Sequence, residues 1–302
     1  MGDGVDEHTI GVLTNIGLFA FIALSAYLLL ITGEMSFAQQ AFFGVGAYAG
    51  GICTALLGWP LPLALVVAMA AGALAQWLVA RPTLRLRGLY FALASLAAAE
   101  MFRILFEVFR VRVSIDGELV GPDGTQGFRG IRWVFEHGIE PFEFMLLVWA
   151  LLAVVMALFG WMERSRLGAV MRAIGDDRDL AGAVGIDVDR IKLFVAAAAG
   201  ALAAAGGALF AHVNTYIEPR NFDIMLGVHS LAYALIGGLG TVFGPLLGVL
   251  LDIGVLESSR ALGPFRMVVF GGLVAVLLIF RPRGLLDEQL VRRIVRRGGN
   301  AR

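Results

Sequence analysis

Long apolar runs without charged residues dominate the hydrophobic and polar pattern of this chain. Residues 12–32 carry no charge, and neither do residues 37–80. A run of about 18 apolar residues is long enough to cross the roughly 30 Å hydrocarbon core of a bilayer. The pattern therefore predicts an all-α, polytopic bundle of about eight to ten transmembrane helices. The expected crossings are 12–31, 37–57, 61–79, 88–109, 142–162, 191–211, 227–240, 242–257 and 265–280.

Two of these segments differ from the others. The segments 227–240 and 242–257 are short, and glycines interrupt both of them. Neither is long enough to be a secure full crossing. We therefore expect broken helices or half-helices here, such as one bent crossing plus a half-helix.

The basic residues indicate the orientation, because Lys and Arg are enriched in cytoplasmic loops. They gather in the turn 81–87, in the loop 163–190 and in the tail from residue 281 onward, all predicted to be cytoplasmic. The acidic N-terminus and the loops 110–141 and 212–226 are then external. Because the chain starts with acidic rather than basic residues, we expect its first apolar helix to be retained and not cleaved as a signal peptide.

These assignments divide the chain into a transmembrane domain, 1–284, and a basic cytoplasmic tail, 285–302. The tail mixes apolar residues with arginines, which is typical of an interfacial segment on anionic lipid. A solvated tail is the alternative.

Composition supports the membrane assignment and narrows the chemistry. The chain is 59% hydrophobic and 16% charged, whereas soluble domains carry about 25% charged residues. Its single cysteine, Cys53, excludes an intrachain disulfide. The four histidines lack metal-ligand spacing, and the sequence contains no P-loop, Gly-x-Ser-x-Gly or His-Glu-x-x-His motif. We expect no catalytic site, metal, cofactor or nucleic-acid partner.

The cytoplasmic loop 163–190 reads as two short helices. Apolar residues from Leu167 to Ile174 follow helical spacing, and Gly175 is expected to end the first helix. Asp176 or Asp177 can cap the second, which places Leu180, Ala181 and Val184 on one side and stops at Gly185. One interpretation is a connector packed on the membrane domain. The other is a pair of coupling helices that docks into a cytoplasmic partner, since connections are usually about 2–8 residues long.

Glycine-rich segments inside the predicted crossings have two interpretations. Small residues allow helices to approach closely, and Gly-interrupted segments in two halves of a chain also mark transport sites. Segments around Gly44 and Gly238 resemble each other at an offset of 194 residues, so we expect both to face a pathway. The candidate pathway residues are Gln39, Gln40, Gly44, Tyr48, Ser230, Tyr233 and Gly238.

Charged residues within crossings are functional by default. Glu100 and Arg103 share a helix face with Glu107 and Arg110. We interpret the outer two as a structural ladder, and the deeper Glu100 and Arg103 as a pair between helices or beside a pathway. Asp252 must face protein or water, because it lies in an apolar run.

Five motifs follow one another along residues 12–286: Gly33 to Tyr48, Leu84 to Tyr90 with Glu100 and Arg103, Ser165 to Ile186, Gly237 to Thr241 with Gly244-Pro245, and Phe280 to Leu285. In this order they resemble the branched-chain amino acid ABC permease family. The resemblance is to its M-type (LivM-type) subunit more than to the H-type partner. Glu34 departs from the pattern, because the family more often has Gln at this position.

The resemblance implies a multi-pass permease subunit of the inner (cytoplasmic) membrane. Its implied partners are a second permease subunit, two cytoplasmic ATPases and an external substrate-binding protein. The implied ATPase-coupling residues are Gly168, Arg172, Asp176, Ala181 and Gly185.

The predicted function is therefore to form the pathway of an ATP-driven importer for branched-chain or other small aliphatic amino acids. One alternative is an ABC permease for urea or short amides. Another is an ion-coupled secondary transporter, for which Glu100 and Asp252 are the candidate coupling acids.

Overall fold

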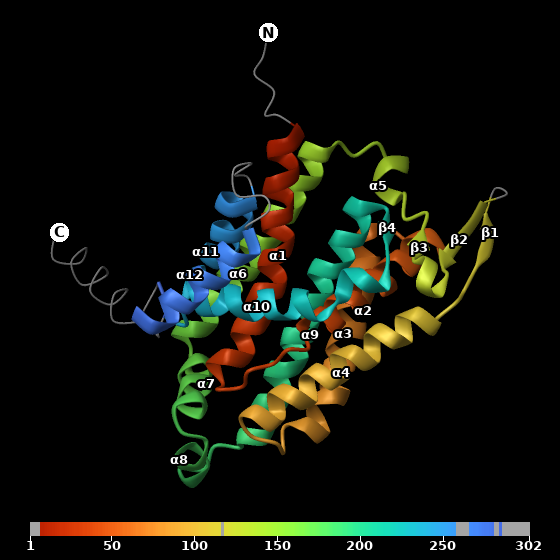
Figure 1. Cartoon of the computed structure of the whole chain (residues 1–302). Helices are drawn as coiled ribbons and strands as arrows, with labels where there is room; N and C mark the ends of the chain where they lie inside the picture. The colour runs from red at the N-terminus through yellow and green to blue at the C-terminus, as the bar shows by residue number, and fades with distance from the viewer. Residues whose placement is uncertain (1–6, 116–117, 258–265, 281–283, 286–302) are drawn as a thin grey trace.

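The computed structural model describes residues 7–115, 118–257, 266–280 and 284–285, and these residues are mostly helical (Figure 1). Most of the predicted tail, 286–302, lies outside the described residues, as do Arg281 and Arg283. The long helices are α1 (Glu7–Ile31), α2 (Gln39–Ala55), α3 (Leu61–Thr83), α4 (Leu89–Val108), α6 (Pro141–Arg164) and α9 (Val188–Asn214). The shorter ones are α5 (Trp133–Glu136), α7 (Arg166–Asp176), α8 (Arg178–Ala183), α10 (Ile224–Gly237), α11 (Phe243–Val249) and α12 (Arg266–Phe280).

Helix α1 forms the centre of the fold. It is buried almost continuously from Ile16 to Ile31 and contacts α6, α9, α10 and α11 (Figure 1). A helix that is apolar on all sides is stable only where all its sides are covered. The N-terminal apolar run therefore becomes the core around which the other helices assemble.

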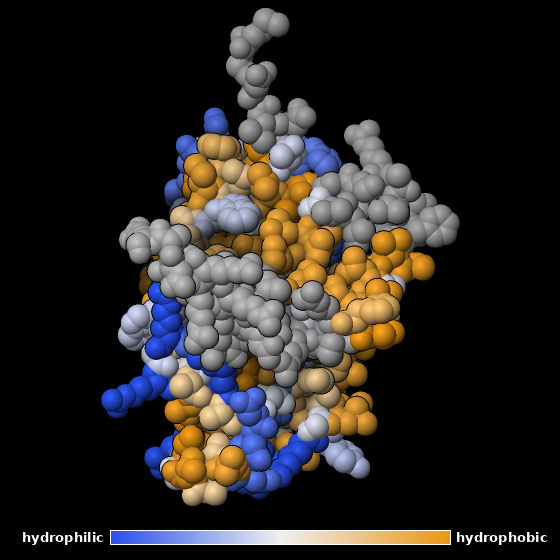
Figure 2. All heavy atoms as spheres, turned by 90° about the vertical axis from the view of Figure 1, so that its left-hand side faces the viewer, coloured by the Kyte–Doolittle hydropathy of each residue, from blue (hydrophilic) through white to orange (hydrophobic). Residues whose placement is uncertain are grey.

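Five helices, α1, α3, α4, α6 and α9, are long and apolar enough to cross a membrane. This confirms the predicted polytopic helical class, and Figure 2 shows extensive apolar surface in the upper and right-hand parts of the view. The other predicted crossings form shorter helices, α2, α10, α11 and α12. The structure thus combines long spans with shorter helices.

Small residues bring α2, α3 and α9 together. A Cβ on Gly46 would collide with the backbone of Ala204, and one on Gly207 would collide with the carbonyl of Phe43. Gly200 of α9 lies equally close to α3. These glycines serve the close approach of helices that small residues permit in membranes.

The two glycine-interrupted segments form a hairpin of short helices. Helix α10 ends at Gly238, whose φ of +94° favours glycine. Gly237 then faces Gly244, and Gly248 faces the backbone of Tyr233, so α11 runs back along α10. Helix α11 continues as the π-helix η3 (Leu250–Glu257). The predicted break is confirmed, and its form is a hairpin.

The two predicted external loops meet in a small sheet. Its strands are β1 (Val113–Ile115), β2 (Glu118–Pro122), β3 (Phe128–Arg129) and β4 (Tyr216–Ile217), all antiparallel and in the order β1-β2-β3-β4. Short 3₁₀ turns, η1 (Gly124–Gln126) and η2 (Pro219–Phe222), flank them. The sequence pattern did not predict this sheet. It lies at the opposite end of the molecule from α8 (Figure 1).

Candidate transport pathway and coupling surface

The loop 163–190, predicted to be cytoplasmic, folds into the two predicted helices, α7 and α8. The first helix continues one residue past Gly175 to Asp176. Asp177 caps α8, because its side chain accepts hydrogen bonds from the backbone N–H groups of Asp179 and Leu180. Asp187 caps α9 in the same way, through the N–H of Arg190. Short polar side chains at both boundaries therefore define the loop.

The five predicted coupling residues occupy different environments. Gly168 is buried against the end of α6, and Arg172 donates to the carbonyl of Glu163 at 2.8 Å. Ala181 is buried against α7 and α9, whereas Asp176 is exposed. Gly185, also exposed, has a φ of +89° that permits the turn after α8. Gly168, Arg172 and Ala181 thus lie where they hold the loop in place.

Two apolar side chains point outward here, Leu180 of α8 and Val184, the residue that caps its C-terminal end. They are 64% and 71% exposed, while Ala181 is 3% exposed. The predicted common side of these three residues is therefore wrong: successive helical residues point about 100° apart, and Ala181 faces inward. Figure 2 shows apolar surface among charged residues at the end of the molecule where α8 lies.

Salt bridges tie α8 to the basic turn that precedes α4. Arg87 donates to both carboxylate oxygens of Asp179 at 3.0 and 3.1 Å. Arg178 donates to the carbonyl of Leu84 at 3.2 Å and to Asp189 at 2.6 Å. The Arg87 guanidinium holds the pKa of the Asp179 carboxyl below its ordinary value, first by hydrogen bonding and then by its charge. Two of the predicted cytoplasmic segments therefore lie together.

Three predicted pathway residues form one stripe on α2. Gln40, Gly44 and Tyr48 recur every four residues and so share a helix face, which we call the α2 stripe. Gly44 faces two aromatic rings: a Cβ there would lie 2.7 Å from Phe106 and 3.0 Å from Phe222. In contrast, Gln39 points elsewhere and is held by Ser25 and Ser36.

Aromatic rings close the outer part of the α2 stripe. The rings of Tyr48 and Phe106 stack with centroids 4.6 Å apart, and Phe222 lies 5.9 Å from Phe106 and 6.1 Å from Tyr48. Phe128 of β3 is 6.2 Å from Tyr48. The buried Gln40 Oε1 and Tyr48 hydroxyl have no hydrogen-bond partner among the described residues. Buried polar atoms without partners are costly and call for an explanation.

The remaining predicted pathway residues lie on α10 and do not join the α2 stripe. Ser230 donates to the carbonyl of Gly227 on its own helix at 2.7 Å. Tyr233 donates to the buried Asp252 at 2.6 Å, and Gly238 ends the helix. Gly44 lies inside α2 while Gly238 lies at a helix end, so the 194-residue offset does not relate equivalent positions.

The charges on α4 form a ladder along one helix. Arg103 lies between Glu100, at 2.6 Å, and Glu107, with salt bridges to both. All three side chains are partly exposed. Arg110 lies beyond the end of α4, where it forms a backbone bridge with Asp123.

Glu34 forms a buried ion pair with Lys192 that the sequence pattern did not predict. Their side chains are 5% and 4% exposed, and the ammonium donates to Glu34 Oε1. The two residues are 158 positions apart. The only sequence feature that singled out either residue of this pair is the departure of Glu34 from the family motif.

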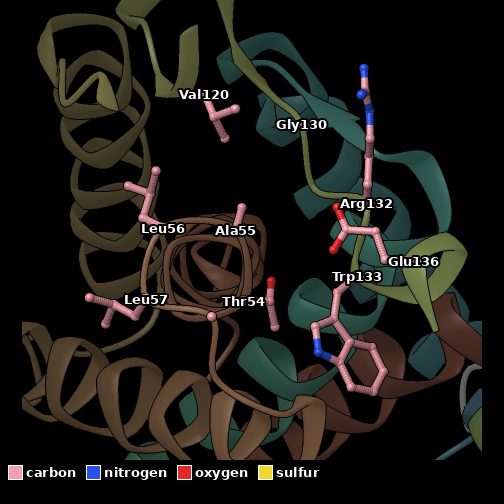
Figure 3. A pocket seen from close by; sticks show the side chains of 10 residues that line it. Thr54, Ala55, Leu56, Leu57, Val120, Gly130, Arg132, Trp133 and Glu136 are labelled. Atoms are coloured by element: carbon pink, nitrogen blue, oxygen red, sulfur yellow. The ribbon is translucent and has the colours of Figure 1, made fainter. Parts of the chain in front are cut away.

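A hollow of about 710 Å³ lies at the outer end of α2 and is also lined by β2 and α5. Figure 3 shows Glu136 directing its carboxylate toward the hollow, while the Arg132 guanidinium points away. At its α2 wall, Thr54 Oγ1 lies 2.9 Å from Nε2 of the buried His212. Helix α2 thus runs from the neighbourhood of Glu34 to this hollow.

No group of three or more His, Cys, Asp or Glu residues that could hold a metal occurs among the described residues. These features together define a polytopic membrane protein of the transport class. They are the buried polar groups on α2, the charges on a membrane helix and a helical loop with exposed apolar residues.

Comparison with known proteins identifies the family. The model of the "Branched-chain amino acid transport system / permease component" matches residues 8–281. The permease protein LivM of Salmonella typhimurium is 30% identical over 91% of this chain and 67% of its own length. LivH of Escherichia coli is 27% identical, over 87% and 89% respectively, and a probable LivH of Methanocaldococcus jannaschii is 26% identical, over 89% and 87%. No solved structure matches. The chain belongs to the branched-chain amino acid transport permease family, a membrane component that is not itself an enzyme.

Proposed function

We propose that this chain forms the pathway of an ATP-driven importer for branched-chain or other small aliphatic amino acids. Its proposed partners are a second permease subunit, two cytoplasmic ATPases and an external substrate-binding protein. The LivM and LivH relatives are named as components of branched-chain amino acid transport systems. The observation that carries the proposal is the exposed pair Leu180 and Val184 on α8.

Leu180 and Val184 form the proposed ATPase-docking surface. Helix α8 contains Arg178 and Asp179, and Asp187 follows shortly after it, so the surface lies outside the apolar spans. Apolar side chains that face neither lipid nor core are typical of a protein interface. A cytoplasmic domain that covers these two side chains would remove their apolar surface from water.

The charged ladder of α4 supports a second permease subunit. Helix α4 is a membrane span, and a lipid-facing charge near the bilayer centre costs about 2.5 kcal/mol or more. Glu100, Arg103 and Glu107 are partly exposed in the isolated chain. A second subunit or a water-filled conduit next to α4 would remove that cost.

The α2 stripe is the proposed inner wall of the pathway. In this structure the pathway is closed by the rings of Tyr48, Phe106 and Phe222. The unpartnered polar atoms of Gln40 and Tyr48 suit a route that opens to solute or water. Substituting Gly44 by Leu would not test this wall, because the side chain would collide with Phe106 and Phe222. Tyr48→Phe keeps the ring stack and removes only the hydroxyl, so we expect altered uptake with normal assembly.

The proposed function is tested by co-purification of an ATPase with the detergent-solubilised chain. Leu180→Arg combined with Val184→Arg places charge on the docking surface and should abolish ATPase recovery and leucine uptake. Ala181→Arg would be a poor choice, because Ala181 is buried. Leu119→Arg is the matched control, since Leu119 is 65% exposed on β2 at the opposite end.

The control variant should retain the ATPase. Equal ATPase recovery by the double variant and the wild type would refute the docking surface. If no ATPase accompanies the wild-type chain, the importer itself is refuted and a secondary transporter becomes the better explanation.

A further inference from the structure

The ion pair between Glu34 and Lys192 joins two parts of the chain with different proposed roles. Glu34 lies in the short linker between α1 and α2, and Lys192 lies near the start of α9. Both side chains are almost completely buried. Buried ion pairs are weak evidence for stability, because desolvation offsets much of their attraction, and their best attested use is to set a register or a switch.

The linker that carries Glu34 also rests directly on the end of α7. A Cβ on Gly33 would lie 3.3 Å from the Cα of Gly175, and one on Gly175 would collide with the carbonyl oxygen of Ile31. The backbones of the linker and of α7 are therefore in contact. Because a Cβ would collide at Gly175 and would be tight at Gly33, whose φ is +79°, no side chain separates the two segments, and α7 presses directly on the linker.

The other partner, Lys192, follows α8 closely. Helix α8 ends at Ala183, the turn passes through Gly185, and α9 begins at Val188 with Asp187 as its cap. The linker is thus held on one side by the end of α7 and on the other by the start of α9. These are the two elements that flank the proposed docking surface.

The linker leads directly into the pathway helix. Helix α2 begins at Gln39, five positions after Glu34, and Ala38 at its N-cap makes no side-chain capping bond. The α2 stripe starts at the next residue, Gln40. The position of Glu34 therefore influences where the first turn of the stripe lies.

We propose that the Glu34–Lys192 ion pair transmits the movement of α7 and α8 to α2, and so couples ATP hydrolysis to opening of the pathway. This inference deepens the proposed function and rests on it. Glu34 and Lys192 are positioning residues, because neither touches the α2 stripe or the docking surface. The ion pair Arg112–Asp123 in the segment 110–141, with side chains 41% and 18% exposed, serves as the contrast.

The test is made on the complete reconstituted importer in lipid vesicles, with leucine as solute and the external binding protein present. The measured quantity is leucine transported per ATP hydrolysed. Glu34→Leu combined with Lys192→Met removes both charges and leaves apolar side chains, a replacement that proteins often tolerate. We expect normal assembly and continued hydrolysis, with transport per ATP lowered about tenfold, within the usual range of coupling between sites.

A charge exchange and a control complete the design. Glu34→Lys combined with Lys192→Glu restores the attraction in reverse and should recover most of the transport per ATP. Arg112→Gln breaks the contrast pair at the opposite end of the molecule from α8 and should leave the ratio unchanged.

Three results would overturn the inference. The first is a wild-type ratio in the apolar double variant, and the second is an exchange variant that recovers none of the ratio. The third is a parallel fall of assembly, hydrolysis and transport in the apolar double variant, which would assign the pair to folding alone. Absence of ATP hydrolysis in the wild-type assembly is a different outcome, because it refutes the proposed function itself.

Discussion

The predicted cytoplasmic loop 163–190 and the predicted external loop 110–141 have similar lengths, but α8 of the first is attached to the membrane helices in a different way from the second. The external loop inserts Phe128 and Ile131, both fully buried, into the aromatic core around Tyr48. In the loop 163–190, α7 buries Met171 and Ile174, whereas α8 buries only the small side chain of Ala181. Salt bridges from Arg87 to Asp179 and from Arg178 to Asp189 add to the contacts of α8.

This difference separates a rigid attachment from an adjustable one. Truncating a side chain in an interdigitated aromatic core lowers the free energy of unfolding by several kcal/mol. Exposed salt bridges contribute little to that free energy. We infer that the external sheet stays fixed on the outer ends of the helices. Helix α8 can shift at low cost, which suits an element that a partner moves.

The largest expected contrast between the two loops is their accessibility across the membrane. Cys53 is the only cysteine and is buried, so Cys53→Ala leaves a background without thiols. In that background we expect Leu119→Cys to react with a membrane-impermeant maleimide in intact cells. Leu180→Cys should react only after lysis. Labelling of both cysteines in intact cells would show that the two loops lie on the same side of the membrane. Labelling of Leu180→Cys alone in intact cells would show that the predicted orientation is reversed.

The next effect concerns stability at the external loop. Phe128→Ala removes a fully buried ring next to Tyr48 and Phe106, so it should lower the free energy of unfolding by about 3–5 kcal/mol. Leu180→Ala, on the exposed side of α8, should change it by less than about 0.5 kcal/mol. Thermal unfolding in detergent measures both. A loss of equal size in the two variants would show that α8 is packed as tightly as the sheet.

Local sequence signals predicted the cytoplasmic loop well. Its helix boundaries follow from Asp177, Gly185 and Asp187, each of which acts on residues within one turn. The four-residue spacing of Gln40, Gly44 and Tyr48 is a local signal as well, but the predicted set did not use it and included Gln39, which points elsewhere. Apolar run length likewise predicted the membrane helices.

Contacts between distant residues were not predictable in this way. The strands β3 and β4 have only two residues each and pair across the five intervening helices α5 to α9, so no periodic pattern indicates them. The partner of Glu34 lies 158 residues away. The inward direction of Ala181 depends on Ile174 and Val188, which lie on the neighbouring helices α7 and α9. Tertiary packing decides each of these features, and a single sequence does not record it.

A smaller effect tests the capping of α8. Asp177→Ala removes the acceptor for two backbone N–H groups, which costs about 1 kcal/mol of helix stability. We expect faster hydrogen exchange of the α8 amides by about fivefold, since 1.4 kcal/mol corresponds to a factor of ten. Asp176→Ala, one residue earlier and outside the cap, is the control. Equal hydrogen exchange of the α8 amides in the two variants would show that Asp177 does not determine where α8 begins.

The smallest effect is the pH dependence of the contact between α8 and the turn before α4. Arg87 lowers the pKa of Asp179 below its ordinary value of 3.8, and Arg178 adds to the shift. Because the folded pKa is depressed, the contribution of this pair to stability is complete above the ordinary pKa and is lost as the pH falls through the lowered value. The protection of the α8 amides, which is the intrinsic exchange rate divided by the measured rate, should therefore be constant from about pH 6 to 8 and fall only in strong acid. Asp179→Asn should remove that acid response and leave the protection near neutral pH almost unchanged, because both side chains are largely exposed. A marked change of α8 protection near neutral pH in the wild-type chain would show that another titrating group holds this helix, and α8 would then be less free to move than its contacts imply.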